Sequence, residues 1–156
     1  MVSAGISEGI ILAASVIVAA SLSGVVLSKA GALNSAFTVA SEAQKEATLT
    51  KIKIVYAIGT SSSPTVNVWV KNVGSTPVTN TDKVDVYFGA IGSTTRIAYN
   101  SGSNPQWVYN PAMSVWQVKD TVRIDITMTG NLAASTTYMV KIVTSNGITD
   151  EYIFST

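Results

Sequence analysis

The sequence has 156 residues and a formal net charge of +1, and only 12% of its residues are charged. This balance offers no excess of Lys and Arg to hold phosphates, so it argues against nucleic-acid binding. Histidine and cysteine are both absent from the sequence, which excludes imidazole-based catalytic triads, thiolate chemistry and zinc–thiolate sites.

An uncharged run of twenty residues from Gly9 to Ser28 lies close to the start of the sequence. A bilayer core about 30 Å thick is spanned by about 20 apolar residues of helix. The run is longer than the 7–15 or so apolar residues of a signal peptide, and no Lys or Arg precedes it. We therefore expect a retained helix that either spans a membrane or packs against copies of itself in a filament.

The helical pattern continues past the apolar run and predicts a first region over residues 1–50. After Lys29 an amphipathic face recurs at spacings of three and four, through Leu33, Phe37, Ala40, Gln44 and Ala47. A helix over residues 6–50 would be about 65 Å long, at about 1.5 Å per residue. Because this length exceeds the thickness of any bilayer, about half of the helix is expected to stand outside the membrane or to pack on protein.

Small residues are dense within the apolar run. Ser15, Ala19 and Ser23 repeat at intervals of four, and Ala20 with Gly24 makes a second pair at the same interval. Such spacing lets two helix backbones approach closely. We interpret these residues as a surface for helix self-association, in preference to an Ala-rich anchor that contacts only lipid.

Glu8 is the one charge beside the apolar run, and two interpretations of it stay open. A carboxylate near a helix N-terminus is favoured by the helix dipole by about 0.3–1 kcal/mol. Alternatively, Glu8 enters an apolar helix bundle and pairs with the terminal amine of a neighbouring chain. Burying it unpaired would cost several kcal/mol, so such a pair would fix the register of assembly.

Beyond residue 50 the apolar residues alternate with polar ones, which is typical of half-buried antiparallel strands. Seven or eight short strands predict an antiparallel Ig-like β-sandwich over residues 51–156, and so an α+β chain. The Asn146-Gly147 pair is typical of a type I′ hairpin turn. The predicted strands cover residues 51–56, 65–70, 83–88, 122–128, 137–143 and 150–154, with weaker ones at Thr95–Tyr99 and Val115–Val118.

Catalytic and cofactor-binding motifs are hard to find in this sequence. Asp82 and Asp85 come closest to a paired carboxylate site for Ca²⁺, but solvated surface carboxylates are the more economical interpretation. EF-hand, Walker A and dinucleotide-binding motifs are absent. We therefore expect no enzyme activity, no cofactor and no metal site.

Three aromatic residues lie in a segment of irregular pattern that contains Pro105 and Pro111. Trp107, Tyr109 and Trp116 are expected to cap one end of the sandwich core. The alternative is that they form an interface with a neighbouring subunit or a surface protein, because Trp and Tyr are effective interface anchors.

The whole chain resembles the archaeal type IV pilin superfamily, and within it the archaellum (archaeal flagellum) proteins. Counted from Ala4, Glu8 is fifth, the position where mature type IV pilins carry a glutamate. The resemblance is sharpest to the FlaG accessory group, through the strand VWVKNVGS at residues 68–75 and the closing hairpin SNGITD at residues 145–150. Two departures are the lack of a basic leader ending at Gly and the lack of Asn-x-Ser/Thr glycosylation sites.

This resemblance implies a non-enzymatic subunit of an archaellum or pilus-like filament, with helices bundled as its core and sandwiches facing outward. The implied partners are further copies of the chain, other archaellum or surface-layer proteins, and the membrane before assembly. The alternative is a membrane-anchored stator or accessory protein whose sandwich grips the surface layer. In both cases we expect the sandwich outside the cytoplasm, on a surface filament or at the cytoplasmic membrane.

Overall fold

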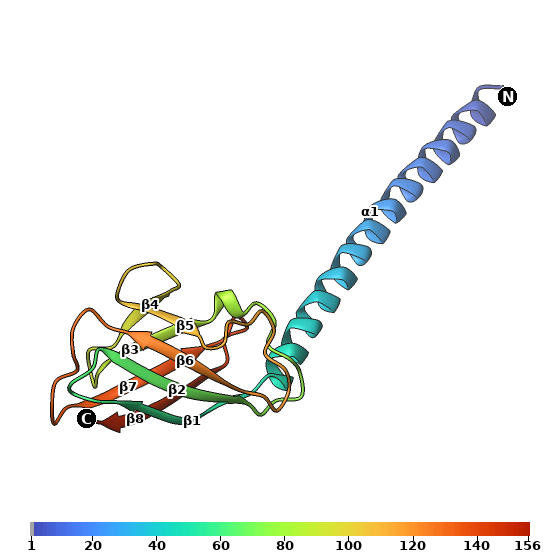
Figure 1. Ribbon diagram of the computed structural model, residues 1–156. Helices are drawn as coiled ribbons and strands as arrows, with labels where there is room; N and C mark the ends of the chain where they lie inside the picture. The colour runs from blue at the N-terminus through green and yellow to red at the C-terminus, as the bar shows by residue number, and fades with distance from the viewer. Residues whose placement is uncertain (1) are drawn as a thin grey trace. The chain divides into compact units, whose positions relative to one another are not determined.

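The computed structural model describes the backbone of residues 2–156 and the side chains of residues 5–45 and 48–156. The chain divides into two units, Met1–Ala43 and Gln44–Thr156. One long helix makes up the first unit, and an all-β sandwich makes up most of the second (Figure 1). The chain is therefore α+β, as its sequence predicts.

Helix α1 spans Val2–Leu49 without interruption. No proline falls within it, and Ala and Leu, which favour helices, are frequent along it. It ends where the sequence changes to the alternating β-branched pattern that starts at Ile52. Ala47, the last member of the predicted apolar face, lies outside the described side chains.

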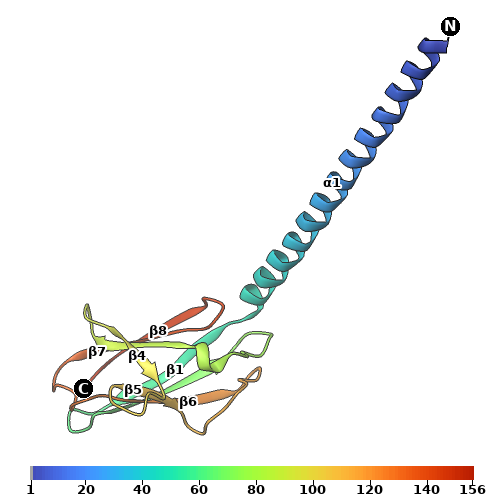
Figure 2. The same cartoon turned by 90° about the horizontal axis from the view of Figure 1, so that it is seen from above.

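The sandwich is one eight-stranded sheet folded into two layers (Figures 1 and 2). The order of strands is β1-β2-β6-β5-β4-β3-β7-β8, and β4 pairs both with β3 and with β5, which joins the two layers. The elements are β1 (Ile52–Gly59), β2 (Thr65–Asn72), η1 (Thr81–Lys83, a short 3₁₀ helix), β3 (Asp85–Ala90), β4 (Thr95–Tyr99), β5 (Gln106–Tyr109), β6 (Thr121–Thr127), β7 (Thr137–Val143) and β8 (Thr149–Ser155).

Two features of the sandwich differ from the sequence prediction. The expected strand at Val115–Val118 is only an isolated bridge between Val78 and Trp116, and a strand forms instead at β5. The pair β4–β5 is parallel rather than antiparallel. Parallel neighbouring strands ordinarily need a long crossover connection. This ladder has only two residue pairs, Ala98↔Gln106 and Tyr99↔Trp107, which join the end of β4 to the start of β5. Because the strands overlap so little, a short loop suffices to connect them.

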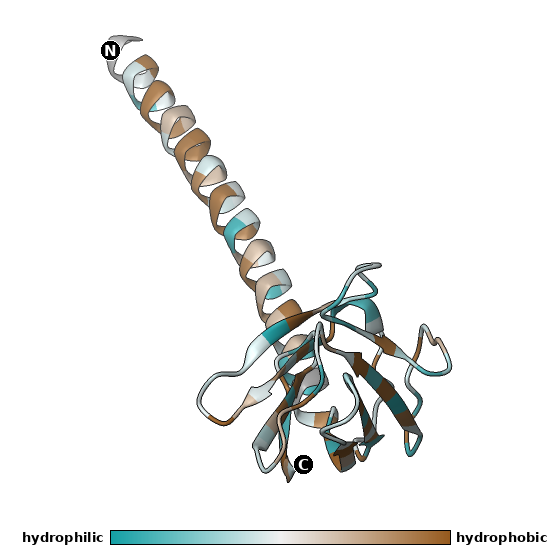
Figure 3. Ribbon diagram, turned by 60° about the vertical axis from the view of Figure 1, so that its left-hand side comes forward, coloured by the Kyte–Doolittle hydropathy of each residue, from teal (hydrophilic) through white to brown (hydrophobic). Residues whose placement is uncertain are grey.

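The core lies between the two layers and is built by strict alternation along the central strands. Val66, Val68 and Val70 of β2 face inward, as do Ile124 and Ile126 of β6, and all five are fully buried. Figure 3 shows this alternation as hydrophobic and hydrophilic bands along the strands. At about 25 cal/mol per Å² of buried apolar surface, such a core is the main source of the sandwich's stability.

Candidate assembly surfaces

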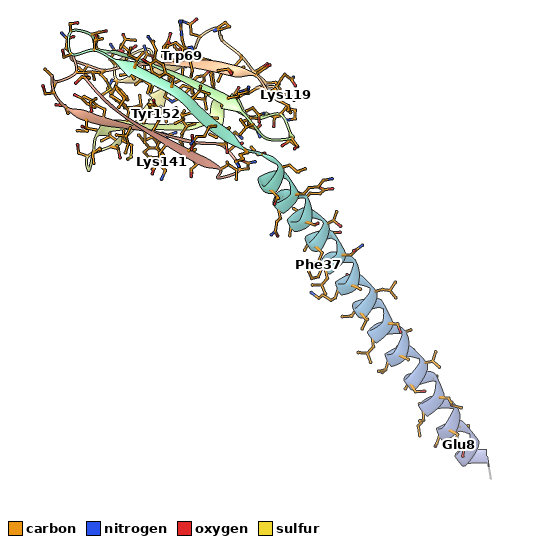
Figure 4. The ribbon with its side chains drawn as sticks, turned by 90° about the horizontal axis from the view of Figure 1, so that it is seen from below. Glu8, Phe37, Trp69, Lys119, Lys141 and Tyr152 are labelled. Atoms are coloured by element: carbon orange, nitrogen blue, oxygen red, sulfur yellow. The ribbon has the colours of Figure 1, made fainter. Side chains whose placement is uncertain are left out.

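Between Gly9 and Ser28, helix α1 exposes apolar side chains on every side of its axis, and after Lys29 they gather on one face. Every side chain from Gly5 to Lys45 is exposed in the isolated chain, and this stretch is long and apolar enough to cross a membrane. Hydrophobic residues follow one another along the helix in Figure 3, and Figure 4 shows side chains projecting from it in all directions. A helix that is apolar all round is stable only inside a membrane or a protein bundle.

The predicted small residues form two narrow strips on α1. At about 100° per residue, Ser15, Ala19 and Ser23 lie on one side of the helix, and Ala20 with Gly24 lie about 100° around from them. The Ser15 hydroxyl donates to the Leu12 carbonyl, and the Ser23 hydroxyl donates to the Ala19 carbonyl. Both oxygen–oxygen distances are 2.8 Å. Because these hydroxyls are satisfied within the helix, the strip can face an apolar neighbour without an orphaned polar group.

Glu8 lies on the same side of α1 as the first strip. Seven residues separate it from Ser15, which at about 100° per residue is only about 20° short of two full turns. The helix begins at Val2, so Glu8 lies beyond its first turn. Because the dipole acts mainly within the first turn, it offers Glu8 little stabilisation.

The structure places Trp107, Tyr109 and Trp116 in the core of the sandwich. Their exposed fractions are 0%, 4% and 0%, and the ring centroids of Tyr99 and Trp107 are 4.6 Å apart. The Tyr109 hydroxyl donates to the Thr81 carbonyl over 3.1 Å, and burial raises the pKa of this hydroxyl. These three side chains thus stabilise the fold and offer no surface to a partner in the folded chain.

A group of exposed apolar side chains lies instead on the two edge strands of the sandwich. Val55, Tyr56 and Ile58 of β1 and Ile153 of β8 are 40–53% exposed. A groove of about 550 Å³ runs between β1 and β8, lined in part by Tyr56, Tyr152 and Phe154. A break in the β1–β2 register between Ile54 and Tyr56 turns two consecutive apolar residues outward. The three consecutive apolar residues 54–56 were the sequence signal for this surface, which the sequence analysis missed.

Two motifs, residues 68–75 and residues 145–150, carry the resemblance to the FlaG group. Both contact residues 49–54, which we call the junction segment. From the first motif, the Ser75 amide donates to the Leu49 carbonyl and the Gly74 amide to the Lys51 carbonyl, over 2.8 and 2.9 Å. A Cβ on Gly74 would lie 2.5 Å from the Leu49 oxygen, so only glycine fits there. The strand motif is thus explained by its contact with the end of α1 and the start of β1.

The hairpin motif contacts the same junction segment from the other layer. Asn146 Nδ2 donates to Thr50 Oγ1 over 2.9 Å, and Asp150 accepts from the Ile54 amide and from Lys53 Nζ over 2.6 and 3.0 Å. Gly147 has a φ of +82°, whereas Asn146 is not among the residues with positive φ. The turn is therefore not the type I′ turn that the sequence predicts, which needs positive φ at both residues.

The two carboxylates considered for Ca²⁺ do not form a cluster in the structure. Asp85 Oδ1 lies 2.6 Å from Arg96 Nε, and Asp82 is exposed on η1. Among the described residues no group of three or more His, Cys, Asp or Glu side chains could hold a metal ion. Ca²⁺ takes six to eight oxygen ligands, and these two residues supply too few.

Comparisons with known proteins give one family and two kinds of structural neighbour, a stator protein and a filament. The family model of archaeal-type flagellin matches residues 3–154. The archaellum periplasmic stator protein FlaG from Sulfolobus acidocaldarius is 38% identical, with a TM-score of 0.63, over 68% of this chain and 100% of that one. The FlaF–FlaG stator complex of the same organism contains a chain that is also 38% identical, with a TM-score of 0.62, over 68% of this chain and 90% of that one.

A solved filament has the same fold over most of the chain. The archaeal flagellum of Methanospirillum hungatei strain JF1 matches with a TM-score of 0.65 and 17% identity, over 97% of this chain and 92% of that one. Among curated proteins nothing matches.

Proposed function

Because the chain belongs to the archaeal-type flagellin family, we propose that it is a structural subunit of an archaellum filament. In this proposal α1 helices of many copies bundle as the filament core, and the sandwiches face outward. The helix serves as a membrane anchor before assembly and as core after it. The role is non-enzymatic, and the partners are further copies of this chain and other archaellum or surface-layer proteins.

The observation that carries the proposal is the exposed apolar surface in the second half of α1. Leu33, Phe37 and Val39 are 60%, 72% and 67% exposed, and all three follow the uncharged run. The 41 residues from Gly5 to Lys45 measure about 60 Å, about twice the thickness of a bilayer core. Lipid can cover only about half of this length, and packing against other copies would cover the apolar face of the rest.

A second role, as a membrane-anchored stator or accessory protein, is favoured by one specific observation. The FlaG stator protein is 38% identical over the whole of its solved chain, which corresponds to 68% of this chain. In that role α1 would be an anchor, and the sandwich would bind an extracytoplasmic partner through an exposed surface such as the β1–β8 groove.

Oligomeric state of the full-length protein in detergent tests the proposal. The filament role predicts oligomers held by α1, and Ala19→Leu is expected to weaken them at least about tenfold, because overpacking a close contact typically costs 1–3 kcal/mol. Ala14→Leu is the matched control, since Ala14 lies about 140° around the helix from Ala19. A wild-type protein that stays a monodisperse monomer would contradict the filament role and favour the stator role.

A further inference from the structure

The first forty-one residues of the sequence carry two charges, Glu8 and Lys29, of opposite sign. Both side chains are exposed in the isolated chain. In the helix bundle of the proposed function they would be buried among apolar side chains, where an unpaired charge is strongly unfavourable. The bundle must therefore bring an opposite charge to each of them.

Glu8 and Lys29 cannot meet within one chain. Twenty-one residues of helix separate them, or about 31 Å at about 1.5 Å per residue. At about 100° per residue they are also only about 60° apart around the axis. Both side chains therefore lie on the same side of α1, and both can face the interior of one bundle.

A parallel copy displaced by those twenty-one residues brings Lys29 of one chain level with Glu8 of the next. The same displacement brings Phe37 of the first chain level with residue 16 of the second, between Ser15 and Ala19. Phe37 is the one aromatic residue before residue 50 and is 72% exposed. A single displacement thus opposes unlike charges and also sets the largest side chain of α1 over the small-residue strip, as close packing requires.

We propose, on the basis of the filament function above, that neighbouring copies of this chain pack their α1 helices in parallel with a displacement of twenty-one residues. The Glu8 carboxylate of one copy then pairs with the Lys29 ammonium of the next, and this pair fixes the register. Phe37 fills the space above Ser15 and Ala19 of the neighbour. The surface between Glu8 and Gln44 is therefore an interaction surface for a second copy of this chain.

Charge reversal in the full-length protein tests the pair. After removal of detergent, the assembled protein is measured by sedimentation. Glu8→Lys and Lys29→Glu are each expected to lower the association constant at least about a hundredfold. The double variant carrying both reversals is expected to assemble within severalfold of wild type. Lys71→Glu, on an exposed position of β2, is the matched control and should assemble as wild type does.

The outcomes separate this pairing from other contacts of Glu8. If Glu8→Lys blocks assembly while Lys29→Glu does not, another cation such as a terminal amine binds Glu8, and the Glu8–Lys29 pairing is wrong. If neither reversal matters, or the double variant does not recover, the pairing is also wrong, although the filament function stands. If the wild-type chain does not assemble, the filament function itself fails, and this pairing fails with it.

Disulfide trapping measures the displacement without changing a charge. The sequence has no cysteine, so an introduced pair is unambiguous. Mixed assemblies of Ala19→Cys and Ala40→Cys chains, whose positions differ by twenty-one residues, are expected to give disulfide-linked dimers. Ala19→Cys mixed with Ala36→Cys is the control, since its positions are about 6 Å out of register. More dimer from the control pair than from the test pair would overturn the proposed displacement.

Discussion

The two units of this chain treat their apolar side chains in opposite ways. The sandwich buries Val, Ile, Phe and Trp side chains between its layers, whereas every side chain of α1 from Gly5 to Lys45 is exposed. The sandwich therefore contains what it needs to fold, and α1 requires a membrane or other helices. Stability of the folded unit therefore resides in residues 44–156, and the proposed function assigns assembly to residues 2–43.

Removal of residues 1–43 is expected to have the largest effect, because it separates self-association from folding. The remaining unit, Gln44–Thr156, keeps the core and the junction segment with its hydrogen bonds. We expect it to stay monomeric in water without detergent, to lose all membrane partitioning and self-association, and to unfold cooperatively. Sedimentation and thermal unfolding check this, with the detergent-solubilised full chain as control. A truncated chain that aggregates or is unfolded would show that the sandwich depends on α1.

Trp107→Ala is expected to have the largest effect of a single substitution on the sandwich. The side chain is fully buried, and loss of a buried Trp typically costs about 3–5 kcal/mol of unfolding free energy. Trp69→Ala is the matched control, because Trp69 is half-buried on the outer face and packs on Tyr56. Denaturant unfolding of the 44–156 fragment measures both. Equal losses for the two variants would argue against the burial of Trp107.

Asp150→Ala is expected to have an intermediate effect, through the junction segment. The substitution removes the acceptor for the half-buried Ile54 amide at 2.6 Å, which should cost about 1–3 kcal/mol. Lys53→Met removes only the exposed partner at 3.0 Å and should cost no more than about 1 kcal/mol. If the two variants lose the same stability, the hydrogen bond to Ile54 contributes nothing.

The smallest expected effect is an alkaline loss of stability through Tyr109. Its pKa is raised in the folded state by burial, so the folded protein holds the proton more tightly than the unfolded chain does. Stability from this group is complete below about pH 10 and falls as pH rises further, by up to about 1.4 kcal/mol per pH unit. Tyr109→Phe should flatten that part of the pH profile, and an unchanged slope would contradict the prediction.

The sequence predicts the regular part of this fold well and the irregular part poorly. Long alternating strands such as β2 and β7 are confirmed close to the expected bounds, because several residues share one pattern. Strand β5 has only four residues between two loops, which leaves too short a pattern to recognise. The strand expected at Val115–Val118 fails because Trp116 pairs only with Val78 across a bridge.

Some of the candidate surface residues could be predicted from the sequence and others could not. The exposed strip on α1 can be predicted because helical geometry alone sets which residues share a side. The strand that carries Trp107 could not be predicted, because β5 depends on tertiary pairing with β4 and β6. The exposed edge at Tyr56 depends on a register break in β1 that the alternation of single residues does not reveal.

The most direct test of the central role of α1 is the location and amount of the full-length protein in the organism that makes it. Surface filaments sheared from the cells and the washed membranes would be compared by quantitative mass spectrometry of intact chains and N-terminal peptides. The filament function predicts that this chain is an abundant component of the sheared filaments. Its confinement to membranes at low copy number would contradict that function and establish an anchored accessory role.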